Sequence, residues 1–420
     1  MRALRRAPAR AWIVPAVYTV AALAAGVALP RIEERFWFEA FSNISSSSAI
    51  AIYSSIASGT MTLSAIVFSL TFVMVQFGAT AYSPRLALWL AEDPLISHAL
   101  GIFTATFLYS IAALAWVDRN DRDGVPLLSA VIVVCLLLAS IAAFIALIKR
   151  VAVLQVSRLL GFIGDQGRTG IALLSRETPG DAAPRVQLHP AAATQVIRHG
   201  DRPRTVQALD TRMLLQLACE ANARIDVVAA VGDSVIESTP LIYVFGTGTE
   251  ISGRRLRSAI HLGDQRTFEQ DPQFAIRLLV DIAIRALSAA INDPTTAVQA
   301  LDQIGDLVLR LGRTRLPDDA IRDASGTVRV VIPRATWDDV VRLALEEIAA
   351  YGASSVQVMR RMNALLSELT AALPPERRSA LGYWRRRLEA SITRHFPDLE
   401  QRRDAGASDR QGLGMSRPGS

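Results

Sequence analysis

The sequence predicts a membrane α-helical domain of four transmembrane helices, followed by a cytoplasmic α+β domain. Of the 420 residues, 51% are hydrophobic and the mean hydropathy is +0.28, which is typical of a membrane protein with a soluble portion. Within residues 1–150, four windows are apolar over the roughly 20 residues that a helix needs to cross a hydrocarbon core about 30 Å thick. From residue 151 the composition becomes that of a soluble domain.

The four predicted spans are residues 11–29, 50–79, 96–117 and 126–148. The second belongs to a long uncharged stretch, because no charged side chain occurs between Glu39 and Arg85. The serine-rich start of this stretch, FSNISSSSAIAIY, is too polar for a hydrocarbon core. We therefore expect it to be an interfacial or extracytoplasmic lead-in to one long helix.

Small and polar residues follow one face of that second helix at a spacing of three to four. They are Ser55, Gly59, Thr62, Ser69, Gln76 and Thr80, interrupted by Ile66 and Val73. Such a face can pack tightly against other membrane helices. It can also line a water-filled path in a homo-oligomer. Both interpretations hold if the helix packs around a central axis.

The charges beside the spans predict their orientation, because arginine and lysine concentrate on the cytoplasmic side. Arg2, Arg5, Arg6 and Arg10 precede the first span, and Lys149, Arg150 and Arg158 follow the fourth. The two outer loops balance their arginines with acids. We expect a multi-pass protein of the bacterial inner membrane with both termini cytoplasmic, and an uncleaved first span, since a clear small-residue cleavage site is missing.

The predicted cytoplasmic domain covers residues 151–400. We expect it to be β-rich over about 203–247 and helical over about 254–396, with a disordered tail at 401–420 of Gly, Ser, Arg and Asp. A helix from Asp271 or Pro272 to Ala290 is almost wholly apolar apart from three charges spaced four residues apart.

These charges are Arg277, Asp281 and Arg285, and their apolar surroundings suggest burial, where an unpaired charge is costly. One acid between two arginines leaves surplus positive charge. Either Asp302 or Asp306 completes the network, or a site remains for a small anionic ligand. The candidate site residues of this domain are Arg266, Arg277, Asp281, Arg285, Asn292 and Asp293.

The segment INDPTT divides two predicted helices, 272–290 and 294–311. Asp293 is a suitable N-cap, and Pro294 suits the first helical turn, where its missing N–H costs nothing. This accounts for Asp293 and Pro294 and leaves Asn292 unexplained. The corner is either a structural joint or a site that receives a ligand or a signal.

Several classes of protein are excluded by what the sequence lacks. Lys149 is the only lysine, which rules out a P-loop, a Schiff-base enzyme and a lipoyl or biotinyl carrier. The two cysteines are isolated and the five histidines are scattered, so we expect neither a metal site nor a cofactor. No catalytic motif occurs, so no enzymatic activity is expected. The net charge of +6 comes from arginine in an alanine-rich chain, and we expect no nucleic-acid partner.

Two long segments carry a family resemblance, SGTMTLSAIVFSLTFVMVQFGATAYSPRL and RTFEQDPQFAIRLLVDIAIRALSAAINDPTTA. They resemble the uncharacterised bacterial membrane family catalogued as domain of unknown function 2254, over most of residues 10–370. The resemblance implies a membrane location and no established activity. From the residues we predict a homo-oligomeric channel or permeation protein with a cytoplasmic regulatory domain. The alternative is a membrane-anchored sensor or scaffold that binds a small anionic ligand or a protein.

Overall fold

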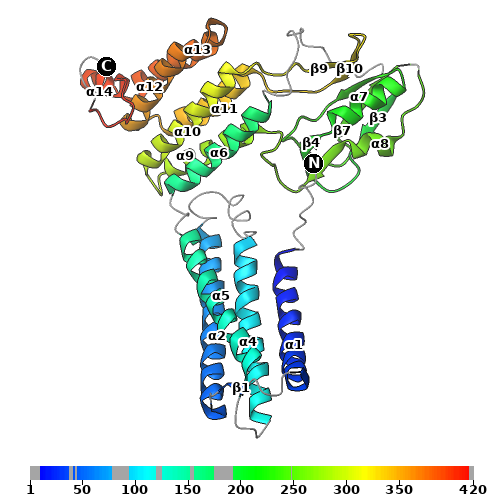
Figure 1. Cartoon of the computed structure of the whole chain (residues 1–420). Coiled ribbons are helices and arrows are strands. Elements are labelled where there is room, and N and C mark those ends of the chain that lie inside the picture. The colour runs from blue at the N-terminus through cyan, green and yellow to red at the C-terminus, as the bar shows by residue number, and fades with distance from the viewer. Residues whose placement is uncertain are drawn as a thin grey trace. The chain divides into compact units, whose positions relative to one another are not determined.

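The computed structural model describes residues 10–36, 41–42, 45–77, 94–119, 125–151, 156–174, 193–246 and 248–415. The chain divides into two compact units, Met1–Gln155 and Val156–Ser420. The division falls five residues after the domain boundary expected from the sequence. Each unit is described by itself, and Figure 1 shows the elements of both.

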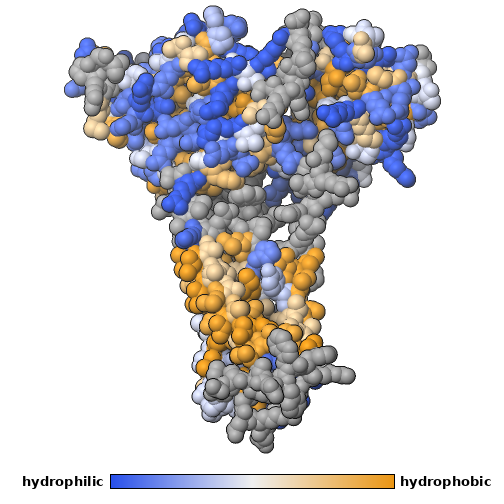
Figure 2. Space-filling model, viewed as in Figure 1, coloured by the Kyte–Doolittle hydropathy of each residue, from blue (hydrophilic) through white to orange (hydrophobic). Residues whose placement is uncertain are grey.

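Four long apolar helices form the first unit. They are α1 (Arg10–Phe36), α2 (Ser46–Phe77), α4 (Pro94–Arg119) and α5 (Leu127–Val151). Their candidate spans are Ile13–Glu33, Ser46–Val73, Leu95–Arg119 and Leu127–Lys149, which confirms the four predicted membrane helices. Residues 78–80, at the end of the predicted second helix, lie outside the described residues. Figure 2 shows the hydrophobic surface of these helices.

Helix α4 is the inner helix of this unit, since it packs against α1, α2 and α5. In its span 44% of the residues are buried, whereas the other spans have at most 22%. Helix α2 begins at Ser46, before the start expected near residue 50, so the end of the serine-rich stretch belongs to this helix. A two-residue strand pair, β1 (Phe41–Ser42) with β2 (Val125–Pro126), precedes α2 and α5.

Helix α5 has a charged cap that comes from α1. The Glu33 carboxylate is buried and accepts hydrogen bonds from the backbone N–H groups of Leu128 (2.8 Å) and Ser129 (3.4 Å). A carboxylate stabilises a helix N-terminus because it satisfies free N–H groups and interacts favourably with the helix dipole. Glu33 therefore has a structural role within the unit.

The strands of the second unit form two sheets. The five-stranded sheet has the order β3 (Gln195–Arg198), β7 (Pro240–Phe245), β5 (Arg224–Val227), β10 (Val328–Val331) and β9 (Ala320–Arg322), and only β5 and β10 are parallel. The three-stranded sheet has the order β6 (Ser234–Val235), β4 (Arg204–Leu209) and β8 (Ile260–Gly263). Helices α7 (Thr211–Glu220) and α8 (Gly253–Ser258) accompany these strands. One hydrophobic core is shared by both sheets and α7.

The helical part of this unit consists of α6 (Val156–Leu174), α9 (Pro272–Ala286), α10 (Pro294–Arg313), α11 (Trp337–Tyr351), α12 (Val356–Ala372), the short η4 (Pro375–Arg377), α13 (Arg378–His395) and α14 (Leu399–Gly406). Together with the sheets this confirms the expected α+β class. The helical range expected over about 254–396 also contains β8 and β9, and β10 lies within the segment TVRVVIP, whose composition predicts a strand.

Helix α6 packs closely on α9 and α10 through three glycines. A Cβ atom at Gly164 would lie 2.2 Å from the Gln303 side chain, and one at Gly167 would lie 2.8 Å from Leu307. At Gly170 it would lie 3.3 Å from the Phe268 carbonyl oxygen. The Gln303 side chain could move aside for a side chain at Gly164, whereas a larger side chain at Gly167 would also meet the Cβ atom of Ala275 (2.9 Å), and one at Gly170 would meet backbone.

Part of the range 401–420, where the sequence suggested disorder, contains helix α14. Ala405 in it is fully buried. Arg360 of α12 donates to the Asp404 carbonyl oxygen (2.6 Å), and Arg410 pairs with Glu368 of α12 (2.8 Å). Tertiary contacts of this kind order a segment whose composition alone gives no reason to fold.

Candidate functional site

The second unit contains a cavity of about 390 Å³ bordered by the three-stranded sheet, the turn after β5, helix α6, the N-terminus of α9 and the segments that flank β9 and β10. Its apolar wall includes Leu173, Leu174, Leu209, Leu316 and Ile332. Its polar and charged wall consists of Thr211, Asp233, Arg266, Glu269, Gln270, Asp271, Gln273 and Arg334. The volume lies at the lower end of the range for small-molecule sites.

An ion pair at the start of α9 forms one wall of the cavity. Asp271 is the N-cap of α9 and accepts from the Phe274 N–H (3.1 Å). Its carboxylate is 2% exposed and pairs with Arg266, at 2.7 Å from Nη2 and 2.8 Å from Nε. The Arg266 guanidinium also lies 5.3 Å from the centre of the Phe274 ring. The same carboxylate therefore caps the helix and fixes Arg266.

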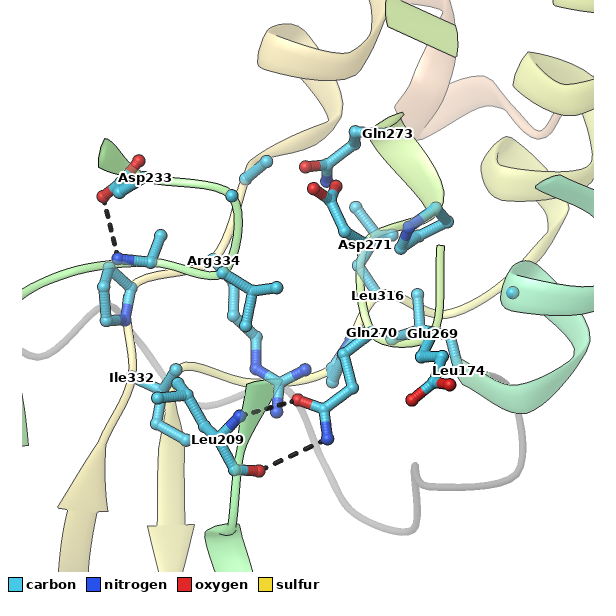
Figure 3. A pocket seen from close by; sticks show the side chains of 18 of the residues that line it. Leu174, Leu209, Asp233, Glu269, Gln270, Asp271, Gln273, Leu316, Ile332 and Arg334 are labelled. Atoms are coloured by element: carbon cyan, nitrogen blue, oxygen red, sulfur yellow. Dashed lines mark hydrogen bonds between the residues drawn. The ribbon is translucent and has the colours of Figure 1, made fainter. Parts of the chain in front are cut away.

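Burial and neighbouring charges determine the pKa of Asp271. Burial raises the pKa of Asp271 above its ordinary value, and Arg266 and the Phe274 N–H only partly oppose this effect. The nearby negative charge of Asp233 also raises the pKa. Asp233 belongs to the turn on another side of the cavity (Figure 3). Two carboxylates from different elements thus influence one another across the same space.

The turn that carries Asp233 depends on a glycine. Gly232 has φ +95°, a left-handed conformation that residues with a Cβ rarely adopt. A Cβ there would lie 2.8 Å from Oδ2 of Asp271 and 2.9 Å from Nη2 of Arg266. Gly232 therefore lets the turn approach the ion pair. The contact between Gly232 and Asp271 joins residues 39 positions apart and could not be predicted from the sequence.

Gln270 joins the α9 end of the cavity to the sheet. Its side-chain oxygen accepts from the Leu209 N–H (3.0 Å), and its side-chain nitrogen donates to the Leu209 carbonyl oxygen (3.3 Å). Figure 3 shows both bonds, with Arg334 beside them and Glu269 on the opposite side of Gln270. The polar wall is therefore held by specific contacts between elements that are distant in sequence.

The predicted network on α9 is completed by an acid from α11, and neither Asp302 nor Asp306 takes part in it. Arg277 bonds to Asp281 (2.8 Å from Nε) and makes two bonds to Glu347, of 2.6 and 2.8 Å. The hydrogen bonds with Glu347 raise the pKa of Arg277, and the same bonds lower the pKa of Glu347. Asp302 pairs with Arg361 (2.7 Å), and Asp306 pairs with Arg168 (2.6 Å).

The remaining predicted residues of the cytoplasmic site are dispersed. Arg285 is half-buried and has no ion-pair partner among the described residues. Asn292 is exposed with φ +48°. Asp293 is the N-cap of α10, as predicted, and accepts from the Thr296 N–H (3.0 Å) and hydroxyl (2.6 Å). Of the six candidate residues, Arg266 alone borders the cavity.

The predicted polar face of α2 is exposed within the first unit. Its members Ser55, Gly59, Thr62, Ser69 and Gln76 are all exposed. The buried face carries other residues, namely Ala49, Tyr53, Ala57, Thr60 and Val67. The hydroxyls of Ser55 and Thr62 donate to the carbonyl oxygens of Ala51 (2.8 Å) and Ser58 (3.0 Å). Satisfied hydroxyls can face lipid or another helix without a large desolvation cost.

Ser55 and Gly59 also border a cavity of about 380 Å³ in the first unit, together with Ile56, Thr60, Leu63 and Leu137. It is open to the surroundings and almost wholly apolar. Within the described part of the chain, no group of three or more His, Cys, Asp or Glu side chains could hold a metal ion.

Comparison with known proteins identifies a family. The family described as Predicted membrane protein (DUF2254) matches residues 9–368. Relatives include the uncharacterized protein Mb1321c of Mycobacterium bovis and the uncharacterized protein Rv1290c of Mycobacterium tuberculosis. Each is 30% identical over 378 residues, which cover 87% of this chain and 72% of the relative. No solved structure shows significant similarity to the chain.

Proposed function

This chain belongs to the predicted membrane protein family DUF2254, and we propose that it is a membrane-anchored sensor whose unit Val156–Ser420 binds a small molecule in the cavity beside α9. The observation that carries this proposal is the wall of the cavity. It combines an apolar surface with the Arg266–Asp271 ion pair, whose carboxylate is buried, and with a glycine turn that closes on that pair. A concave apolar site with a few fixed polar groups is typical of small-molecule binding.

The connectivity of α6 supports a sensing role. Gly170, Leu173 and Leu174 of α6 border the cavity, and α6 begins five residues after the last membrane helix ends at Val151. A ligand that contacts α6 therefore contacts the first helix that follows the membrane domain. A ligand can shift a conformational equilibrium only by the difference in its affinity for the two states. Since α6 lines the cavity, a change in the position of α6 would change the affinity for the ligand.

Two further features of this proposal follow from the sequence. We place the protein in the bacterial inner membrane with both termini in the cytoplasm, because arginines flank the first and fourth spans. We propose binding rather than catalysis, because the sequence carries no recognisable catalytic motif. The anionic ligand expected from the sequence depended on surplus charge beside Arg277, which Glu347 balances, so that network does not support it.

Native mass spectrometry of the full-length protein in detergent micelles tests the sensor. We expect a small molecule to remain bound after purification, and the variant Ala335→Phe to lose it because the added ring fills the cavity. The matched control is Ala290→Phe, since Ala290 is exposed and does not border the cavity. Retention of the same molecule by Ala335→Phe would show that it binds elsewhere.

An oligomeric channel or permeation protein is the second candidate, and the exposed polar flank of α2 favours it. If this flank lines a path in a homo-oligomer, Ser69→Leu should reduce ion flux into liposomes that contain the protein. Phe68→Leu, at a neighbouring exposed position on another face, should leave the flux unchanged. A protein that is monomeric in light scattering and passes no ions would exclude this candidate.

A further inference from the structure

One end of the helical part of the second unit brings together the start of α6 and the corner between α9 and α10. A Cβ atom at Gly167 would lie 2.9 Å from the Cβ atom of Ala275, and one at Gly170 would lie 3.6 Å from Pro272. Later residues of α6 therefore meet earlier residues of α9, so the two helices run antiparallel. The N-terminus of α6 consequently lies at the same end as the C-terminus of α9 (Figure 1).

The corner itself, residues 287–293, is a tight turn that displays an apolar side chain. The backbone N–H groups of Ile291 and Asn292 both donate to the Ser288 carbonyl oxygen, at 3.1 and 2.9 Å. Asn292 has φ +48°, a left-handed conformation that asparagine adopts more readily than most residues. The side chain of Ile291 is 45% exposed. The turn is thus fixed by its own hydrogen bonds, and Asn292 is suited to it, while Ile291 projects from it.

Helix α11 adds an aromatic side chain to the same end. Tyr351, its last residue, is 58% exposed. A Cβ atom at the next residue, Gly352, would lie 3.3 Å from the Leu287 side chain, so α11 ends against the corner. Exposed hydrophobic side chains that gather at one end of a domain indicate an interaction surface. Tyrosine suits a membrane interface, because its ring is apolar and its hydroxyl is polar.

The charge of this end is positive. Arg158 in the first turn of α6 is exposed, and Arg285 in the last turn of α9 is half-buried. Neither makes an ion pair with a described residue. Asp293 is the only acidic residue in the segments that meet here, 156–164, 286–296 and 348–358. Its carboxylate already caps α10, so the two arginines remain without an acidic partner from these segments.

The length of the connecting chain limits how far α6 can start from the bilayer. The fourth candidate span ends at Lys149, α5 ends at Val151 and α6 begins at Val156. A fully extended chain covers at most about 3.6 Å per residue, so the start of α6 can lie no more than about 18 Å from the end of α5. Anionic lipid attracts arginine within about one Debye length, about 10 Å. A lipid surface is therefore within reach of the end that carries Arg158.

We propose that this end of the second unit binds the anionic lipid surface from which α5 emerges. Ile291 and Tyr351 insert among the lipid headgroups, and Arg158 and Arg285 pair with lipid phosphates. Apolar and aromatic side chains combined with arginine are typical of elements that lie on an anionic membrane. This interaction goes beyond the proposed ligand binding and does not depend on it.

Nitroxide labels on the full-length protein test this proposal in nanodiscs of phosphatidylcholine with anionic phosphatidylglycerol. Cys135 and Cys219 are first replaced by alanine, and one label is then attached through Ile291→Cys or, as the matched control, through Ile236→Cys. Ile236 is another exposed isoleucine of this unit (61%) and follows β6. Power saturation measures the accessibility of each label to oxygen, which dissolves in lipid, and to a nickel chelate, which stays in water. We expect the oxygen-to-nickel ratio to be severalfold higher at position 291 than at position 236.

Two results at position 291 would overturn the proposal. A ratio equal to that of the control would mean that the label faces water. Low accessibility to both reagents would mean that protein, such as a second copy of the chain, covers this position instead of lipid.

The lipid charge and one arginine test the electrostatic part. In nanodiscs of phosphatidylcholine alone, the ratio at position 291 should fall, because the attraction between arginine and anionic lipid is lost. Arg158→Gln should lower the ratio in the anionic nanodiscs, whereas the control Arg212→Gln, at an exposed position of α7, should leave it unchanged. A ratio that responds neither to the lipid nor to Arg158→Gln would overturn the pairing of arginine with lipid phosphate. Circular dichroism verifies that each variant is folded.

Discussion

Two arginine–carboxylate clusters on α9 have similar chemistry and different surroundings. At the middle of the helix, Arg277 is shared by Asp281 and Glu347, and none of the three borders the cavity. At the N-terminus, the single carboxylate of Asp271 holds Arg266, and this pair borders a cavity. The first cluster fastens α11 to α9. The second combines a helix cap, an ion pair and a ligand-sized space. The charges that are conspicuous in the sequence belong to the first cluster, so conspicuous charge does not by itself indicate a site.

The largest expected difference between the two clusters is the loss of stability when one carboxylate is removed from each. Asp271→Ala removes the N-cap of α9 and leaves Arg266 unpaired, and should lower the free energy of unfolding by about 3 kcal/mol. Asp281→Ala leaves Arg277 paired with Glu347 and should cost about 1 kcal/mol. Chemical denaturation of the full-length protein in micelles measures both. Equal costs would mean that the two clusters are not distinct.

Replacement of Gly232, in the turn beside the second cluster, is expected to cause the next largest loss of stability. Gly232→Ala combines an unfavourable φ with a Cβ close to Asp271 and Arg266, and should cost about 2 kcal/mol or more. The control is Gly326→Ala, where φ is +84° and no atom lies within 4 Å of the added Cβ. It should cost about 1 kcal/mol, from the backbone alone. If Gly232→Ala costs no more than Gly326→Ala, the turn does not close tightly on the ion pair.

The two arginines expected to form a network on α9 should also differ, since only Arg277 belongs to the first cluster. Arg277→Ala leaves Asp281 and Glu347, both partly exposed, without their shared partner and should cost about 1.5 kcal/mol. Arg285→Ala should cost less than about 0.5 kcal/mol, because the side chain has no ion-pair partner among the described residues. The thermal midpoint of each variant measures the difference. A larger loss for Arg285→Ala would reveal a role that the intramolecular contacts do not explain.

The smallest effect is a pH dependence of opposite sign in the two clusters. Glu347 has its pKa lowered by Arg277, so its contribution to stability is present above 4.5, its ordinary value, and is lost as pH falls through the lowered pKa. Asp271 has its pKa raised by burial, so stability decreases as pH rises from 3.8 through the raised pKa. On acidification, the thermal midpoint of the wild type should fall relative to that of Glu347→Gln. It should rise relative to that of Asp271→Asn.

Local signals in the sequence predicted much of the fold. The four spans followed from hydropathy, and Asp271 and Asp293 follow the ordinary chemistry of helix starts. The partner of Arg277 could not be found in this way, because Glu347 lies 70 residues away and joins α9 only after α11 has packed. The cavity was missed for the same reason, since Gly232 meets Asp271 only in the folded unit.

The close packing of α6 has a practical consequence for dissecting this protein. Gly164, Gly167 and Gly170 bring α6 against α9 and α10, although it precedes the first strand of its unit by about twenty residues. A truncated polypeptide that starts at Gln195, the beginning of β3, would expose the apolar surfaces of Leu307 and Ala275 to water. We expect such a polypeptide to aggregate on expression, and one that starts at Val156 to remain in solution.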